Sequence, residues 1–79
     1  MRCFIVSFKT SDAAMRFENV AHEMSLPGRI IPVPRNITAD CGMAWASPVE
    51  SRQDIENMIA SNNLDVGVSV EMDYRLRVK

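Results

Sequence analysis

The two cysteines are the side chains of this sequence best suited to chemistry, and Cys41 is the better placed of the two. It follows a stretch in which Pro32, Pro34 and Arg35 succeed an apolar run, and Gly42 comes directly after it. Because proline fixes φ and has no backbone N–H, a strand must stop there and a shaped loop must begin. A thiol on such a loop is positioned for nucleophilic chemistry, in which the thiolate is the reactive form.

The neighbours of Cys41 in the sequence act in opposite directions on its reactivity. Arg35 is either a partner for a thiolate or another anion, or a solvated loop residue. Gly42 leaves the backbone beside the sulfur uncrowded, so that its N–H could face an anion. Asp40 acts against a second negative charge nearby. Spacing alone favours the plainer interpretation, in which Cys41 is an inert small residue.

Cys3 lies in an apolar stretch and is expected to be a buried thiol. The alternative is that it resolves a disulfide with Cys41, which requires the two Cα atoms to lie within about 7 Å. Two cysteines are too few for a disulfide framework, and with one histidine they cannot complete a four-ligand zinc site. We therefore expect no metal and no cofactor.

Composition limits the class of protein. The 79 residues allow one domain, 1–79, and the 47% hydrophobic and 24% charged residues are typical of a soluble globular fold. A net charge of −1 gives no electrostatic footprint for nucleic acid. No apolar run approaches the roughly 20 residues that cross a bilayer, and the start is too short and polar for a signal peptide. We expect a cytoplasmic protein with no membrane partner.

The hydrophobic pattern predicts six elements in the order βαββαβ. One helix is expected after the N-cap residues Thr10–Asp12, and a second after a capping box in which Ser47 is the N-cap and Glu50 the N3 residue. Strands are expected at residues 3–8, 29–33, 43–46 and 66–78. The order predicts an α+β, ferredoxin-like sandwich, in which two helices cover one face of a four-stranded antiparallel sheet with strand order 4-1-3-2.

This topology sets where the thiols should lie. We expect strands one and three to be parallel neighbours, which would place Cys3 and Cys41 at the same end of the sheet. The same end would then gather positive charge, and its expected members are Arg2, Arg35, Arg77 and Lys79. Such a basic pole would activate Cys41, because nearby positive charge lowers the pKa of a thiol.

The loop resembles the signature of a small bacterial domain family described as putative selenium/sulfur carrier protein-like. The matching residues are Pro32-Val33-Pro34-Arg35, Ile37-Thr38, Cys41-Gly42 and Ala44, and the resemblance extends over essentially the whole chain. It implies that Cys41 is a carrier thiol that holds sulfur or selenium as a persulfide or selenopersulfide. The resemblance implies that Arg35 and Gly42 shape its environment, whereas Cys3 is not part of the signature. From their positions in the sequence, Pro34 and Asp40 are further expected neighbours of the thiol.

Two main functions follow from this sequence. In the first, the protein is a carrier rather than a turnover enzyme, and Cys41 takes sulfur or selenium from a donor protein and passes it to an acceptor by thiol exchange. In the second, it is a binding or regulatory module, with a partner or a second copy on the open face or an exposed edge of the sheet and Cys41 incidental. A redox switch between Cys3 and Cys41 is a third alternative.

Overall fold

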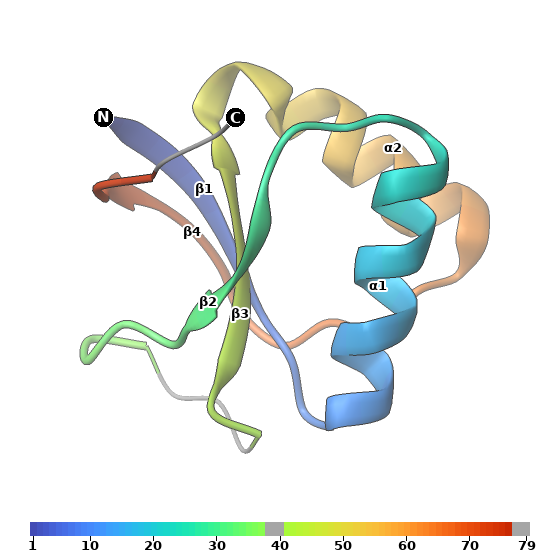
Figure 1. The fold of residues 1–79 in the computed structure, drawn as a ribbon, viewed down its shortest axis with the longest axis horizontal. Helices are drawn as coiled ribbons and strands as arrows, with labels where there is room; N and C mark the ends of the chain where they lie inside the picture. The colour runs from blue at the N-terminus through green and yellow to red at the C-terminus, as the bar shows by residue number, and fades with distance from the viewer. Residues whose placement is uncertain (38–40, 77–79) are drawn as a thin grey trace.

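The computed structural model describes residues 1–37 and 41–76. Within them the chain forms a sheet with two α-helices on one face (Figure 1). The elements are β1 (Arg2–Ser7), α1 (Ser11–Glu23), β2 (Arg29–Pro32), β3 (Met43–Pro48), a 3₁₀ helix η1 (Val49–Ser51), α2 (Arg52–Asn62) and β4 (Ser69–Asp73). The predicted order βαββαβ is confirmed. Strand β4 ends at Asp73, well before the expected position, and residues 77 and 78 of the expected strand lie outside the described ranges.

The sheet has the order β2-β3-β1-β4, and every neighbouring pair is antiparallel. This confirms the α+β, ferredoxin-like architecture and the predicted strand order. The expectation that the first and third strands are parallel is wrong, since Cys3 pairs with Pro48 and Ser7 with Ala44. The helical crossover returns the chain so that β2 runs parallel to β1, and β3 then enters between them, antiparallel to both.

The two helices begin by different means. Thr10, the first of the predicted N-cap residues, is the N-cap of α1, and its side-chain oxygen accepts a hydrogen bond from the N–H of Ala13 at 3.1 Å. The predicted capping box at Ser47 is wrong. Ser47 is a fully buried residue of β3, and its hydroxyl lies 3.5 Å from the carbonyl oxygen of Phe4. The strand therefore runs on to Pro48, and η1 leads into α2 without a side-chain cap.

The main core lies between the sheet and the helices. Aromatic rings dominate it, and the centroid of Phe17 lies 5.1 Å from that of Phe8 and 5.5 Å from that of Trp45. These three rings are almost completely buried, together with Ile55 and Met58 of α2. Burying side chains of this size is worth about 1.5–3 kcal/mol each, so this layer holds both helices on the sheet.

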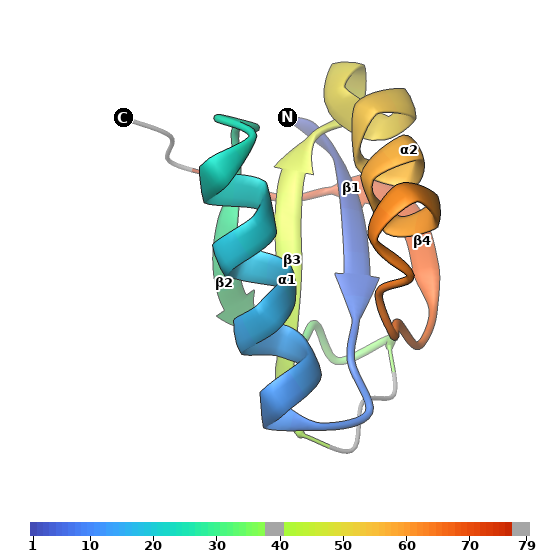
Figure 2. The same ribbon diagram turned by 90° about the vertical axis from the view of Figure 1, so that its right-hand side faces the viewer.

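The face of the sheet opposite the helices is covered by the chain itself. After β4 the chain turns back and crosses behind the sheet (Figure 2). A second cluster of buried residues lies there, and its members are Cys3, Ile5, Ile31, Ile37, Ala44, Ala46 and Leu76. The N–H of Tyr74 donates to the carbonyl oxygen of Met1 at 2.8 Å and fixes the crossing segment at the start of β1. The face on which the binding-module alternative placed a partner is therefore covered, at least in part, by residues of this chain.

Candidate functional site

Cys41 lies two residues before the first residue of β3, partly buried against the main core. Its Sγ is 3.4 Å from the carbonyl oxygen of Phe8 and 3.7 Å from that of Met43. Both groups are acceptors, so the sulfur occupies this position as an S–H donor. The contact with Phe8 ties the loop to the far end of β1, where that strand leads into α1.

Two backbone hydrogen bonds between described residues hold the loop that precedes Cys41. The N–H of Ile37 donates to the oxygen of Pro34 at 3.0 Å and closes a turn, and Ile37 is buried in the second cluster. The N–H of Val33 donates to the oxygen of Gly42, also at 3.0 Å, and joins the two ends of the loop. Gly42 has φ +73°, a region that costs other residues about 1–2 kcal/mol, and open space surrounds the position of a Cβ.

The structure places two of the predicted neighbours at the same end of the sheet as Cys41. Pro34 is partly buried in the turn after β2, and Arg35 follows it with an exposed side chain. None of the ion pairs formed by described residues includes Arg35. Asp40, the predicted opposing charge, lies outside the described residues, as does Thr38 of the signature.

Cys3 is the buried thiol that the sequence favoured, and the alternative of a disulfide with Cys41 does not fit the geometry. Five residues of extended chain, roughly 16 Å, separate Cys3 from Phe8, the residue that Cys41 contacts. That far exceeds the separation of about 7 Å that a disulfide allows. Cys3 is fully buried, its Sγ lies 3.8 Å from the carbonyl oxygen of Tyr74, and burial raises the pKa of this thiol. The structure therefore excludes a Cys3–Cys41 redox switch.

The set of residues predicted to form a basic pole around Cys41 is wrong. Arg2 lies with Cys3 at the opposite end of the sheet, where its guanidinium is 3.9 Å from the Asp73 carboxylate. Arg77 and Lys79 lie outside the described residues. The error follows directly from treating β1 and β3 as parallel, because their antiparallel pairing puts the start of one strand beside the end of the other.

Sequence reasoning missed the residues that do surround Cys41. Phe8 contributes a backbone carbonyl, exposed Lys9 follows it, and Thr10 then caps α1. The first turn of α1 and the start of β3 lie side by side at this end in both views (Figure 1 and Figure 2). If the sequence analysis had paired the first and third strands as antiparallel, it would have predicted that the connection between β1 and α1 lies beside the thiol.

Comparison with known proteins assigns the chain to a family. The family model described as putative Se/S carrier protein-like matches residues 3–70, a stretch that includes the whole loop and Cys41. The chain belongs to this family. No curated protein and no solved structure matches it. No helix in residues 1–37 and 41–76 is long and apolar enough to cross a membrane.

Proposed function

We propose that this Se/S carrier family member holds sulfur or selenium on Cys41, as a persulfide or selenopersulfide, and transfers it between a donor and an acceptor protein by thiol exchange. The observation that carries the proposal is the contrast between its two thiols. Cys3 is fully buried, whereas Cys41 is partly exposed on the loop that the family match includes. A carrier thiol must be reached by two successive partners, and only Cys41 meets this condition.

The transfer requires no oxidant, reductant or cofactor. The Cys41 thiolate attacks the outer sulfur of a donor persulfide, a new S–S bond forms to Sγ, and the donor's S–S bond breaks. The donor leaves as a thiolate and takes up the proton that Cys41 gave up. Attack by an acceptor thiolate on the outer sulfur reverses the bond changes and regenerates Cys41.

Loading should change the position of the Cys41 side chain. In the free protein its Sγ lies within donating distance of the carbonyl oxygens of Phe8 and Met43. Once Sγ is bonded to a second sulfur, it has no proton to donate and would face two acceptors. The side chain then gains by turning outward, past the open space beside Gly42, which presents the outer sulfur to an acceptor.

The exposed cations at this end suit an anionic cargo. Lys9 follows the carbonyl that Cys41 contacts, and Arg35 lies on the turn that is joined to Gly42 through Val33. A persulfide anion turned outward from the core would gain electrostatically from both side chains, and the gain would weaken at high salt. These contacts are long-range and solvated, so their role is to favour approach and retention rather than to drive the exchange.

The test is intact-mass analysis after incubation with a persulfide donor. We expect one added sulfur atom on the wild type and on Cys3→Ala, which retains Cys41, and none on Cys41→Ser. Circular dichroism of each variant shows whether it is folded. An unmodified wild type, under conditions that load an established carrier, would reject the proposal, and so would a sulfur adduct that persists in Cys41→Ser.

A further inference from the structure

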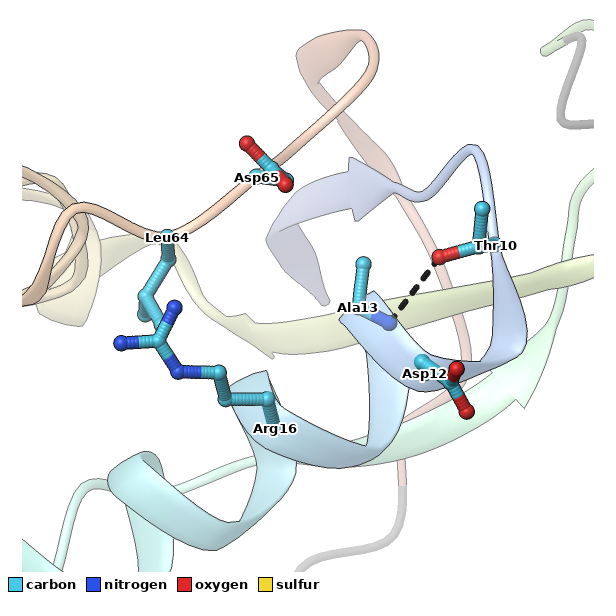
Figure 3. A pocket seen from close by; sticks show the side chains of 6 residues that line it. All are labelled: Thr10, Asp12, Ala13, Arg16, Leu64 and Asp65. Atoms are coloured by element: carbon cyan, nitrogen blue, oxygen red, sulfur yellow. Dashed lines mark hydrogen bonds between the residues drawn. The ribbon is translucent and has the colours of Figure 1, made fainter.

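The chain that joins α2 to β4 runs past a pocket of about 190 Å³ beside the first turn of α1 (Figure 3). The charged side chains around this pocket do not converge, because the carboxylates of Asp12 and Asp65 point apart. Arg16 is directed elsewhere, since it donates to the carbonyl oxygen of Asn62 at 3.0 Å. A ligand site needs polar groups aimed at one molecule. The outer edge of β4, to which this connection leads, offers its polar groups in a regular row instead.

Strand β4 is an edge strand of the sheet, and its backbone N–H groups point alternately toward β1 and away from it. Tyr74, directly after the strand, exchanges two backbone hydrogen bonds with Met1. Bonded and non-bonded positions alternate along an antiparallel pair, so Met72 and Val70 are the residues of β4 that bond to β1. The N–H groups that face outward are those of Ser69, Glu71 and Asp73.

The same edge carries an apolar row on the face of the sheet opposite the helices. Val70 and Met72 are half-buried there against the second cluster. Val68, directly before the strand, is 49% exposed. Because side chains alternate between the faces of a sheet, these three residues lie in one row. The edge therefore combines outward backbone donors with apolar side chains that a further strand would cover.

The opposite edge of the sheet, β2, is closed to such pairing. The N–H of Val33 donates to the carbonyl oxygen of Gly42 toward β3, so the outward positions of β2 are Ile30 and Pro32. Proline has no N–H, and proline on an edge strand prevents further pairing. Another copy of the chain can add at β4 but not at β2, which limits assembly to a closed two-fold dimer.

We propose that a second copy of this chain pairs with the outer edge of β4, antiparallel and about a two-fold axis at Val70. In this register Ser69 of each copy lies opposite Glu71 of the other, and these pairs exchange about four backbone hydrogen bonds. Val70 then faces Val70 of the second copy at the close spacing of a non-bonded pair, and exposed Val68 faces Met72. A register centred on Glu71 would place two carboxylates opposite each other, which is unfavourable.

The charge of Glu71 does not oppose this pairing. Charged side chains on an edge normally discourage the addition of a strand. Here the Glu71 carboxylate accepts a hydrogen bond from Arg52 of α2, whose guanidinium carbon lies 5.0 Å from the centroid of the Phe4 ring. The proposed register adds only the hydroxyl of Ser69 opposite this ion pair, so no like charges meet at the centre of the interface.

The interface does not include Cys41, and the dimer goes beyond the proposed carrier function without depending on it. Cys41 contacts the carbonyl of Phe8, past the end of β1, and precedes β3 rather than β4. The two-fold axis reverses the second copy, so the two thiols lie at opposite ends of the joined sheet. Both loops therefore stay open to other proteins, and the two thiols are too far apart for a disulfide between the copies.

Sedimentation equilibrium of the full chain, from about 10 µM to about 1 mM, tests the association. A single short strand pair buries less than the roughly 1,000 Å² of a stable interface, so we expect a weak dimer, half-formed at about 0.1 mM. Cys41→Ser should associate equally well. A wild type that stays monomeric at the highest concentration would reject the second copy and leave this edge to an extended segment of another protein. A dimer that disappears in Cys41→Ser would also overturn the proposal, because it would be a disulfide.

Two matched lysine variants test which surface is involved. Val68→Lys and Met24→Lys each add one positive charge at an exposed apolar residue, since Val68 is 49% and Met24 48% exposed. We expect Val68→Lys to weaken the association at least about tenfold, because it places a charge against Met72 of the second copy, and Met24→Lys to leave it unchanged. Circular dichroism shows that each variant is folded. Equal effects of the two variants, or no effect of Val68→Lys, would contradict the proposal.

Amide resonances give a residue-by-residue test on the wild type. On dilution, the N–H signals of Ser69 and Glu71 should shift most, because these groups lose their partners in the second copy. The N–H signals of Val70 and Met72, which bond to β1, should shift less, and that of Ile30 on the opposite edge should not move. Shifts that are largest at Ile30 or around Cys41 would place the contact elsewhere and overturn the proposal.

Discussion

Thiol alkylation should distinguish the two cysteines by a large factor, and the structure provides the magnitude. Cys3 is fully buried beneath the segment that crosses the sheet after β4. To reach it, a reagent must displace that segment. Displacement exposes Leu76, at a cost of about 2–3 kcal/mol, and breaks the two hydrogen bonds between Met1 and Tyr74, at about 1 kcal/mol each. At 1.4 kcal/mol for each factor of ten, Cys3 should react about a thousandfold more slowly than an exposed thiol.

Truncating Leu76 tests the origin of this protection. Leu76→Ala should lower the free energy needed to displace this segment by at least about 2 kcal/mol. Alkylation of Cys3 should therefore be about 30-fold faster. The rate at Cys41 should stay the same, because Leu76 belongs to the cluster on the opposite side of the sheet. Met24→Ala, which truncates a side chain that is 48% exposed, is the control and should change neither rate.

The assay is a timed reaction with iodoacetamide, quenched and followed by peptide mass mapping. The alkylation rate of each cysteine is then determined separately in the wild type and in both variants. Comparable rates at Cys3 and Cys41 in the wild type would refute the reasoning, because the far face of the sheet would then be open. So would a Leu76→Ala variant that leaves the rate at Cys3 unchanged.

Three further predictions concern stability, and urea unfolding measures each of them. Thr10→Ala removes the N-cap of α1 and should lower the free energy of unfolding by about 1 kcal/mol. Gly28→Ala should cost about 3 kcal/mol or more, because φ is +137° and the new Cβ would lie 2.7 Å from the Trp45 ring. Above about pH 9, near the ordinary pKa of a cysteine thiol, unfolded Cys3 ionises before the buried thiol does, so stability falls as pH rises. Cys3→Ala should flatten that fall, and an unaltered slope would contradict it.

Local signals in the sequence predicted most of the elements, because each depends on a few adjacent residues. Thr10 belongs to a run of polar N-cap residues in the sequence, and its side chain caps α1 in the structure. Ser47 shows the limit of such signals. Its spacing from Glu50 matches a capping box, but pairing with Phe4 across the sheet buries the hydroxyl inside β3. Tertiary pairing overrode the local preference there.

The candidate site was harder to predict, because most of what surrounds Cys41 is backbone. Residue type does not reveal that the carbonyl of Phe8 meets the thiol, since every residue has a carbonyl. Only the register of β1 against β3 shows it. With the two strands taken as parallel, the sequence placed Cys3 and Arg2 beside Cys41, and with them antiparallel it places Lys9 and the start of α1 there.

The same register accounts for the different chemistry expected of the two thiols. Antiparallel pairing sends Cys3 to the end of the sheet that the chain covers after β4, where burial raises its pKa and holds it as an inert core residue. It sends Cys41 to the opposite end, where a glycine with positive φ and a tied loop leave the sulfur partly exposed. A carrier with two accessible thiols could discharge its own persulfide by forming an internal disulfide, and the distance between these two prevents that reaction. If Cys41 carries a persulfide, as proposed above, separation of the cysteines would favour its retention until an acceptor thiol arrives.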